Sequence, residues 1–173
     1  MSRTLLITPR FRVEEIDVPC SDGTTVRKPI VRHPGAVAVI PVLDENHVGL
    51  IRNRRPTIGA TLVEIPAGTR DPQETPDQTA HRELLEETGY RAGQLTLLCR
   101  FFTSPGVLDE EMHVFVARQL TASVPNPDAG EEIENLRVTW PDALRMVFDG
   151  TIRDAKTIAA LLYYAHERLR HPG

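Results

Sequence analysis

The sequence predicts an α/β fold in which helices flank one mixed β-sheet, with a small antiparallel β unit at the N-terminus. Three observations support this prediction. Residues 36–42 are continuously apolar and rich in β-branched side chains, a pattern typical of a strand buried on both faces. Residues 76–88 lie between helix start and stop signals. Residues 154–169 carry apolar side chains at helical spacing, which predicts a helix packed on the sheet.

The first 32 residues read as strands and turns, and we treat them as a unit distinct from residues 33–173. Residues 11–18 alternate imperfectly between apolar and polar side chains, and residues 25–31 resume an extended pattern. Between them, Asp22 and Gly23 form a dipeptide typical of hairpin turns. A single hairpin is not stable in water by itself, so this unit must pack on the main domain or on another subunit.

The main domain continues as alternating strands and turns, followed by two helices. Further strands are expected at 48–52, 61–65, 94–102, 112–118 and 136–140. The longest loop spans residues 122–130 and is rich in Pro, Asn and Asp. Helices are expected at 141–148 and 154–169. The second of these should bury an apolar face formed by Ile158, Leu161, Leu162, Ala165 and Leu169.

Composition indicates a single globular domain of ordinary polarity. The chain has 173 residues, of which 40% are hydrophobic and 25% charged, with a formal net charge of −4. This charge gives no reason to expect a nucleic-acid partner. No apolar run approaches the roughly 20 residues that span a bilayer, and no signal-peptide core follows the N-terminus, so we expect a cytoplasmic protein without a membrane partner. In that compartment Cys20 and Cys99 are expected to be free thiols rather than a disulfide.

The helix at 76–88 has complete capping signals. Thr75 suits the N-cap position, Pro76 the first helical position, and Gln78 completes a capping box. Gly89 supplies the left-handed residue that ends the helix.

Three glutamates of this helix lie on one side of it. At about 100° per residue, Glu83, Glu86 and Glu87 fall within an arc of about 100°. Carboxylates this close raise one another's pKa unless a cation neutralises them, and all-oxygen ligands suit a hard ion, Mg²⁺ or Mn²⁺. A glutamate-rich helix is usually only a solvated face, and the spacing of the surrounding residues decides between the two interpretations.

That spacing resembles the complete Nudix box. It consists of Gly68, five residues, Glu74, seven residues, and then Arg82, Glu83, Leu84, Leu85, Glu86, Glu87, Thr88, Gly89 and Tyr90. The resemblance implies the Nudix α/β/α sandwich, with a mixed sheet. It also implies a hydrolase that uses a divalent metal ion to cleave a nucleoside diphosphate linked to another group.

Residues outside the box resemble the ADP-ribose pyrophosphatases of that family. Residues 64–68 are similar to the group's Glu-Leu-Pro-Ala-Gly segment, and Pro105 lies 16 residues beyond Gly89, the spacing that marks the group. The segment 152–162 is also similar. This resemblance implies hydrolysis of the pyrophosphate bond of ADP-ribose to AMP and ribose 5-phosphate, by attack of water on phosphorus.

There are three departures from the group. Residues 53–55 are Asn-Arg-Arg where Gln-Tyr-Arg is usual, so that only Arg55 keeps its identity. Gln73 replaces a common Gly. At the end of the loop of residues 122–130, Ala129 and Gly130 precede the acids at 131 and 132. This difference leaves the identity of the catalytic base open.

The resemblance assigns roles to residues of this chain. The metal ligands would be Glu83, Glu86 and Glu87 with the main-chain carbonyl of Ala67. Arg82 would hold the carboxylates in place and Glu74 would orient it or add an outer ligand, whereas the plain alternative for Arg82 is a surface side chain. The candidates for the general base are Glu131 and Glu132, whose plain alternative is a solvated loop end. Substrate contacts are expected from Arg55, Glu64, Pro105 and Glu110, with Arg55 on phosphate and Glu110 on ribose hydroxyls.

We expect a homodimer in which each N-terminal unit helps to build the partner's site, as the resemblance implies. Arg27 and Lys28 would then lie near the substrate of the other subunit. The alternative is a hairpin packed on its own domain. Two other functions stay open, namely a Nudix pyrophosphatase for another sugar nucleotide such as GDP-mannose and a non-catalytic ADP-ribose sensor, which the intact box disfavours.

Overall fold

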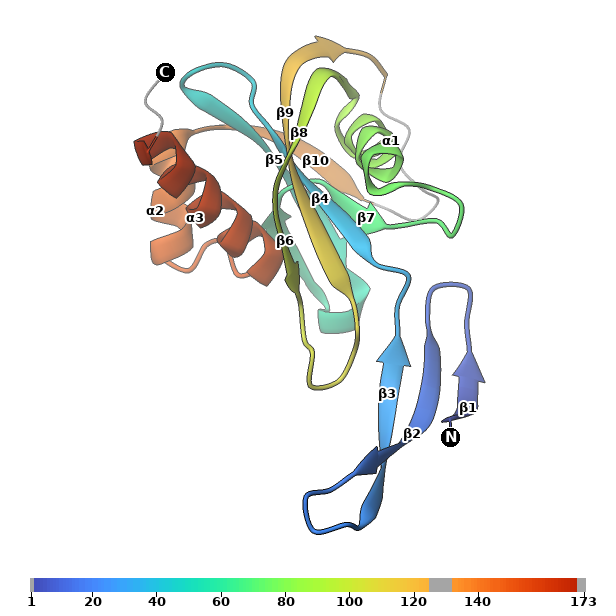
Figure 1. Cartoon of the computed structure of the whole chain (residues 1–173). Helices are drawn as coiled ribbons and strands as arrows, with labels where there is room; N and C mark the ends of the chain where they lie inside the picture. The colour runs from blue at the N-terminus through green and yellow to red at the C-terminus, as the bar shows by residue number, and fades with distance from the viewer. Residues whose placement is uncertain (1, 125–131, 171–173) are drawn as a thin grey trace.

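The computed structural model describes residues 2–124 and 132–170. Figure 1 shows the chain as an N-terminal sheet projecting from a body of sheets and helices. The elements, in chain order, are β1 (Ser2–Ile7), β2 (Arg12–Pro19), β3 (Thr25–Arg32), β4 (Ala36–Pro41), β5 (His47–Arg55), a 3₁₀ turn (Pro56–Ile58), β6 (Ala60–Glu64), β7 (Ala67–Thr69), α1 (Pro76–Thr88), β8 (Tyr90–Phe102), β9 (Glu111–Ala122), β10 (Ile133–Thr139), α2 (Trp140–Phe148) and α3 (Ala155–Arg170).

The strands of the body form two sheets. One is mixed, with the order β7-β4-β9-β8, in which β4 runs parallel to β9 and the other pairs are antiparallel. The other is antiparallel, with the order β10-β5-β6. The mixed α/β class is therefore confirmed, although the strands expected in one sheet are divided between two.

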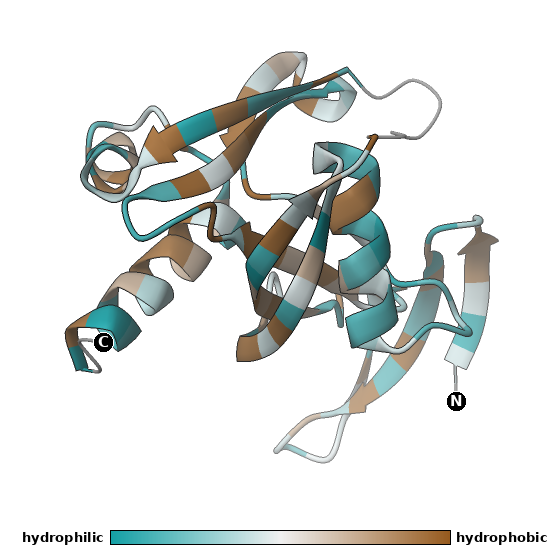
Figure 2. Cartoon of the chain, turned by 90° about the horizontal axis from the view of Figure 1, so that it is seen from above, coloured by the Kyte–Doolittle hydropathy of each residue, from teal (hydrophilic) through white to brown (hydrophobic). Residues whose placement is uncertain are grey.

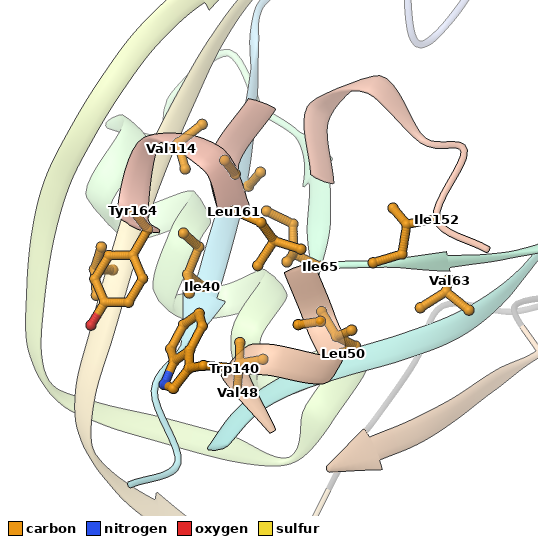
Figure 3. Packing of buried hydrophobic residues seen from close by; sticks show 14 of the residues in the cluster. Ile40, Val48, Leu50, Val63, Ile65, Val114, Trp140, Ile152, Leu161 and Tyr164 are labelled. Atoms are coloured by element: carbon orange, nitrogen blue, oxygen red, sulfur yellow. The ribbon is translucent and has the colours of Figure 1, made fainter. Parts of the chain in front are cut away.

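Strand β4 is buried along its whole length and supplies both layers of the core. Ala38 and Ile40 belong to a large apolar cluster with side chains of β5, β6, β9, α2 and α3 (Figure 3). Val37 and Val39 point to the opposite side, where they pack with Leu84 of α1. Each buried aliphatic side chain of this size contributes about 1.5–3 kcal/mol. This two-sided burial explains the unbroken apolar run, and it places α1 and the α2–α3 pair on opposite sides (Figure 1).

The buried face of α3 differs from the predicted one. Leu161 is buried as expected, but Leu162 and Leu169 are 39% and 81% exposed. The buried positions are instead Thr157, Ala160, Leu161 and Tyr164. Thr157 tolerates burial because its hydroxyl bonds Asp154 and accepts from the Ile65 amide, and the Tyr164 ring lies 4.8 Å from that of Trp140. The predicted face consisted of aliphatic residues alone and therefore left out Thr157 and Tyr164.

The N-terminal sheet has three antiparallel strands, so that β1 joins the predicted hairpin of β2 and β3. It is anchored to the body near Val31, whose amide donates to the Val107 carbonyl at 2.9 Å. Beside this contact Arg32 bonds Asp109 at 2.8 Å and Glu14 at 3.1 Å. Figure 2 shows apolar positions in this sheet beyond the body, and its exposed apolar side chains are Leu5, Leu6, Ile7, Phe11 and Val26.

Among the described residues, no helix is both long and apolar enough to cross a membrane.

Candidate active site

Helix α1 is capped as its sequence predicts. The Thr75 hydroxyl accepts a hydrogen bond from the Gln78 amide, and the Gln78 side chain accepts one from the Thr75 amide at 2.9 Å. At the other end Gly89 has φ of +74° and donates its amide proton to the Leu85 carbonyl. With Leu84 packed in the core, the helix turns Glu83 and Glu87 inward, where both are buried. The apolar anchor and the caps thus fix the direction of the acidic side chains.

Arg82 gathers the acids of the box. Its Nη1 donates to Glu83 at 2.7 Å and to Glu86 at 2.9 Å. Its Nε and Nη2 bind the Glu74 carboxylate at 3.0 Å each. The bonds to Glu74, followed by the charge of Glu83, raise the pKa of Arg82 above its ordinary value. In return, the bond from Arg82 lowers the pKa of Glu74. The contacts expected between Arg82 and the carboxylates are therefore present.

The strand β7 lies against the acidic face of α1. The Glu87 carboxylate accepts a hydrogen bond from the Ala67 amide at 2.8 Å. The Glu83 carboxylate lies against Gly68 so closely that a Cβ at position 68 would overlap it. Glycine allows this approach, whereas any side chain at position 68 would force the Glu83 carboxylate to move.

The carboxylate oxygens of the box are ligands of the type that a hard cation prefers, but they are not arranged around one point as a metal site would be. Across residues 2–124 and 132–170, no three His, Cys, Asp or Glu side chains are arranged to hold a metal ion. Instead one nitrogen of Arg82 binds both Glu83 and Glu86, so a positive group already lies between two of the predicted ligands. The oxygen-only set is the kind that Mg²⁺ or Mn²⁺ binds.

Beside the box, Glu64 binds two cations. It has no exposed area, and both of its oxygens accept hydrogen bonds from Arg55, at 2.8 and 2.6 Å, while Lys156 bonds one of them. Burial acts to raise the pKa of Glu64, but the bonds from Arg55 and the charge of Lys156 outweigh it and hold the pKa below its usual range. Asp154 binds Lys156 from the other side at 3.0 Å.

A cleft in two parts runs along these groups. One part has a volume of about 360 Å³ and includes Glu83, Glu86 and Arg82 in its wall, and the other has about 340 Å³ and includes Glu110 and Lys156. Both parts share Arg55 and the residues 67–69 of β7. The cleft therefore joins the acidic helix to a basic wall, as a charged phosphate-containing ligand requires.

Of the remaining predicted residues, one lines this cleft and the others that the structure describes lie outside it. Glu110 lines it, and there it accepts a hydrogen bond from Thr103 at 2.5 Å. Pro105 lies outside it, in the wall of a separate hollow of about 210 Å³ near the N-terminal sheet. Arg27 and Lys28 are exposed on β3, where Arg27 lies 3.4 Å from Asp17. Of the two base candidates, Glu132 is exposed and Glu131 lies outside the described residues.

Sequence reasoning missed several residues of the cleft. Lys156 and Asp154 belong to a segment predicted as a helix and similar to a known group. The bond from Lys156 to Glu64, 92 positions away, and the ion pair of Lys156 with Asp154 left no local signal. Arg10 and Arg70 line the first part. They lie in the connections between β1 and β2 and between β7 and α1, which the sequence pattern does not distinguish from solvated loops.

Comparison with known proteins identifies the arrangement. The sequence model of the NUDIX domain matches residues 32–161. The chain belongs to the Nudix family. The resemblance of the box is thereby confirmed, and the protein is a hydrolase of a family that depends in general on divalent metal ions.

Relatives of this Nudix hydrolase carry several activities in their names. It is 42% identical to an ADP-ribose pyrophosphatase of Bacillus subtilis, over 87% of this chain and 82% of the relative. It is 38% identical to a methanol dehydrogenase activator of Bacillus methanolicus, over 94% and 88%. It is 35% identical to a GDP-mannose pyrophosphatase of Cronobacter sakazakii, over 84% and 82%. A solved structure of an ADP compounds hydrolase matches with a TM-score of 0.83 and 26% identity, covering 98% of this chain and 92% of the other.

Proposed function

We propose that this Nudix hydrolase cleaves the pyrophosphate bond of ADP-ribose, with AMP and ribose 5-phosphate as products. The observation that carries the proposal is an intact box lining one cleft with Arg55, in a chain 42% identical to an ADP-ribose pyrophosphatase. In the reaction a water oxygen bonds to one phosphorus, and the bond from that phosphorus to the bridging oxygen breaks. The bridging oxygen leaves on the other phosphate.

The box residues prepare the site for a divalent ion, which we propose to be Mg²⁺ or Mn²⁺. Bound there, the ion would neutralise charge on the pyrophosphate and lower the pKa of a bound water. Glu83, Glu86 and Glu87, with the Ala67 carbonyl, are the groups that would hold it. Arg82 now neutralises two of these acids, at 2.7 and 2.9 Å, and holds their carboxylates side by side.

The basic wall binds the substrate phosphates. Arg55 projects into both parts of the cleft, and its guanidinium edge not used by Glu64 is available to phosphate oxygens. Glu64 has no exposed surface, so its part in substrate binding is to position Arg55 and Lys156. Glu110 faces the second part of the cleft, where it accepts hydrogen bonds from ribose hydroxyls. Pro105 lies in the same connection between β8 and β9 as Glu110 but outside the cleft wall, so its part is to shape this connection.

A carboxylate of the segment before β10 takes the proton of the attacking water. Glu131 and Glu132 are the candidates, since a general base must reach the water within hydrogen-bonding distance. Glu132 is exposed immediately before β10 and has no place in the cleft wall, so it would act only after movement of its segment.

The active form in this proposal is a homodimer, with residues 1–32 as the dimerisation unit and 33–173 as the catalytic domain. The N-terminal sheet exposes apolar side chains, among them Ile7 at 75% and Leu6 at 50%, which a partner would cover. Closed two-fold dimers are the commonest assembly of soluble proteins. Arg27 and Lys28, exposed on β3, would then face the partner's substrate.

The test is product analysis with a matched variant. Incubation with ADP-ribose and Mg²⁺ should yield AMP and ribose 5-phosphate in equal amounts by chromatography. Glu87→Gln protein should yield neither at a comparable rate. Release of adenosine or of free phosphate as the first product would contradict the proposed bond cleavage.

A second substrate class has its own support, because a relative named GDP-mannose pyrophosphatase is 35% identical to this chain. The same cleft chemistry would serve either diphosphate, and the sugar and base contacts decide between them.

A further inference from the structure

The wall of the cleft next to the box includes a part of the N-terminal sheet. Pro9 and Arg10, in the turn between β1 and β2, line the first part of the cleft together with Gly68 and Glu83. Figure 1 shows this turn beneath the loop that joins β7 to α1. The turn is held by Thr8, whose hydroxyl donates to the Phe11 carbonyl at 2.6 Å and accepts from its amide at 2.9 Å. Arg10 is therefore presented to the cleft by a constrained turn of its own chain.

Arg70 lines the same wall and has an unpaired buried group. Its backbone amide donates to the Gly35 carbonyl at 3.0 Å, which ties the loop to the residue before β4. Its side-chain Nε is buried and has no hydrogen-bond partner in the described part of the chain. Buried donors in folded proteins nearly always have an acceptor. No acceptor of the described residues therefore holds this nitrogen, and a turn of the Arg70 side chain would bring it to the acceptor oxygens of a ligand in the cleft.

The ion pairs in the cleft show which of its arginines have an acid partner. Arg82 is engaged by Glu74, Glu83 and Glu86, and Arg55 by Glu64. For the residues that the structure describes, no ion pair joins a carboxylate to Arg10 or Arg70. Within residues 2–124 and 132–170, no acid neutralises these two cations of the wall. A guanidinium group can bind two phosphate oxygens at once.

We propose that Arg10 and Arg70 form a second phosphate clamp in the cleft, which binds one phosphate of a nucleoside diphosphate substrate while Arg55, which lines both parts of the cleft, binds the other. This rests on the proposed function and adds two residues to it. It also means that the N-terminal sheet completes the site of its own chain through the turn between β1 and β2, whatever Arg27 and Lys28 do in a partner.

The clamp can be tested by binding without turnover. Arg10→Gln, Arg70→Gln and the double variant are titrated calorimetrically with inorganic pyrophosphate and with ADP-ribose in excess EDTA. The control is Arg54→Gln, because Arg54 carries the same charge on the strand of Arg55 but is exposed and lines neither part of the cleft. Loss of a charge-assisted hydrogen bond predicts a Kd about tenfold higher in each single variant. The control Kd should stay within about twofold.

A clamp that holds substrate and transition state alike should raise KM and leave kcat within a few fold when Mg²⁺ is added. Arg70→Lys should recover part of the affinity, because lysine keeps the charge but not the paired donors. Melting temperatures within a few degrees of the parent would show that the variants are folded.

The outcomes separate this inference from the proposed function. Unchanged pyrophosphate affinity in the double variant, or an equal loss in Arg54→Gln, would overturn the clamp, as would a parent protein that does not bind pyrophosphate at all. If ADP-ribose is hydrolysed and the double variant keeps its Kd and KM, the clamp is wrong and the function stands. If ADP-ribose is not hydrolysed but the variants lose pyrophosphate affinity, the clamp stands and the function is wrong.

Discussion

Replacing Glu64 by glutamine tests the basic wall of the cleft most sharply. Glu64 has no exposed surface and accepts hydrogen bonds from Arg55 at 2.8 and 2.6 Å and a further one from Lys156. Glutamine keeps the shape but removes the negative charge, and it turns an amide group toward one of the two cations. Arg55 and Lys156 then repel each other with no acid between them.

The size of the effect follows from these contacts. A hydrogen bond to a charged group is worth about 1.5–3 kcal/mol, and breaking a buried ion pair costs about 3–5 kcal/mol. The side chain of Arg55 is 34% exposed and can relax into the cleft, which places the expected loss near the lower end, at about 3 kcal/mol. For a domain of this size, that corresponds to a fall in Tm of about 6–12 °C.

The stability lost in Glu64→Gln should become smaller as the pH is lowered. Because the folded state holds the pKa of Glu64 below its ordinary value of 4.5, the charged group stabilises the fold above that pH. The contribution is lost as the pH falls through the lower folded pKa. The Tm difference between parent and Glu64→Gln should therefore be full at pH 7 and shrink as the pH is lowered below 4.5.

Thermal melts followed by circular dichroism between pH 7 and pH 3.5 measure both effects. Glu134→Gln is the matched control, because Glu134 binds Arg52 through two bonds of 2.9 Å at the surface, with the side chains 63% and 49% exposed. Its loss should stay below about 1 kcal/mol. A Glu64→Gln protein that melts within 2 °C of the parent at pH 7, or a difference that persists unchanged in acid, would refute this account of the network.

Two further predictions concern the box and the N-terminal sheet. Glu87→Gln should lower kcat in excess Mg²⁺ by about 100-fold or more with little change in Tm, since glutamine still accepts the Ala67 amide bond; steady-state activity within a few fold of the parent would remove Glu87 from the site. Deletion of residues 1–32 should give a monomer with a much higher KM, by light scattering and kinetics. A full-length protein that is monomeric at micromolar concentration and fully active would contradict the dimer.

Local signals predicted much of the fold and the box. The capping residues of α1 act within one turn of the chain, so that Thr75, Pro76, Gln78 and Gly89 could be assigned from their order alone. The two-sided burial of β4 follows from an unbroken apolar run. Both features depend on neighbours in sequence.

Features that depend on distant contacts were not predictable in this way. The division of the strands into two sheets and the buried face of α3 depend on which elements meet. Thr157, for example, tolerates burial because its hydroxyl bonds Asp154 and the distant Ile65 amide. Nothing in the sequence around Glu64 indicates that it forms an ion pair with Lys156 of α3. The same holds for Arg10 and Arg70, which line one wall of the cleft from two separate connections of the chain.

The central claim is the identity of the substrate, and one competition measurement tests it directly. ADP-ribose and GDP-mannose are supplied at equal concentration with Mg²⁺, and the rates of AMP and GMP formation are compared in the same mixture. The ratio of these rates gives the ratio of the two kcat/KM values. We predict that AMP forms faster by at least about tenfold; faster formation of GMP would contradict the assignment and favour a GDP-mannose pyrophosphatase.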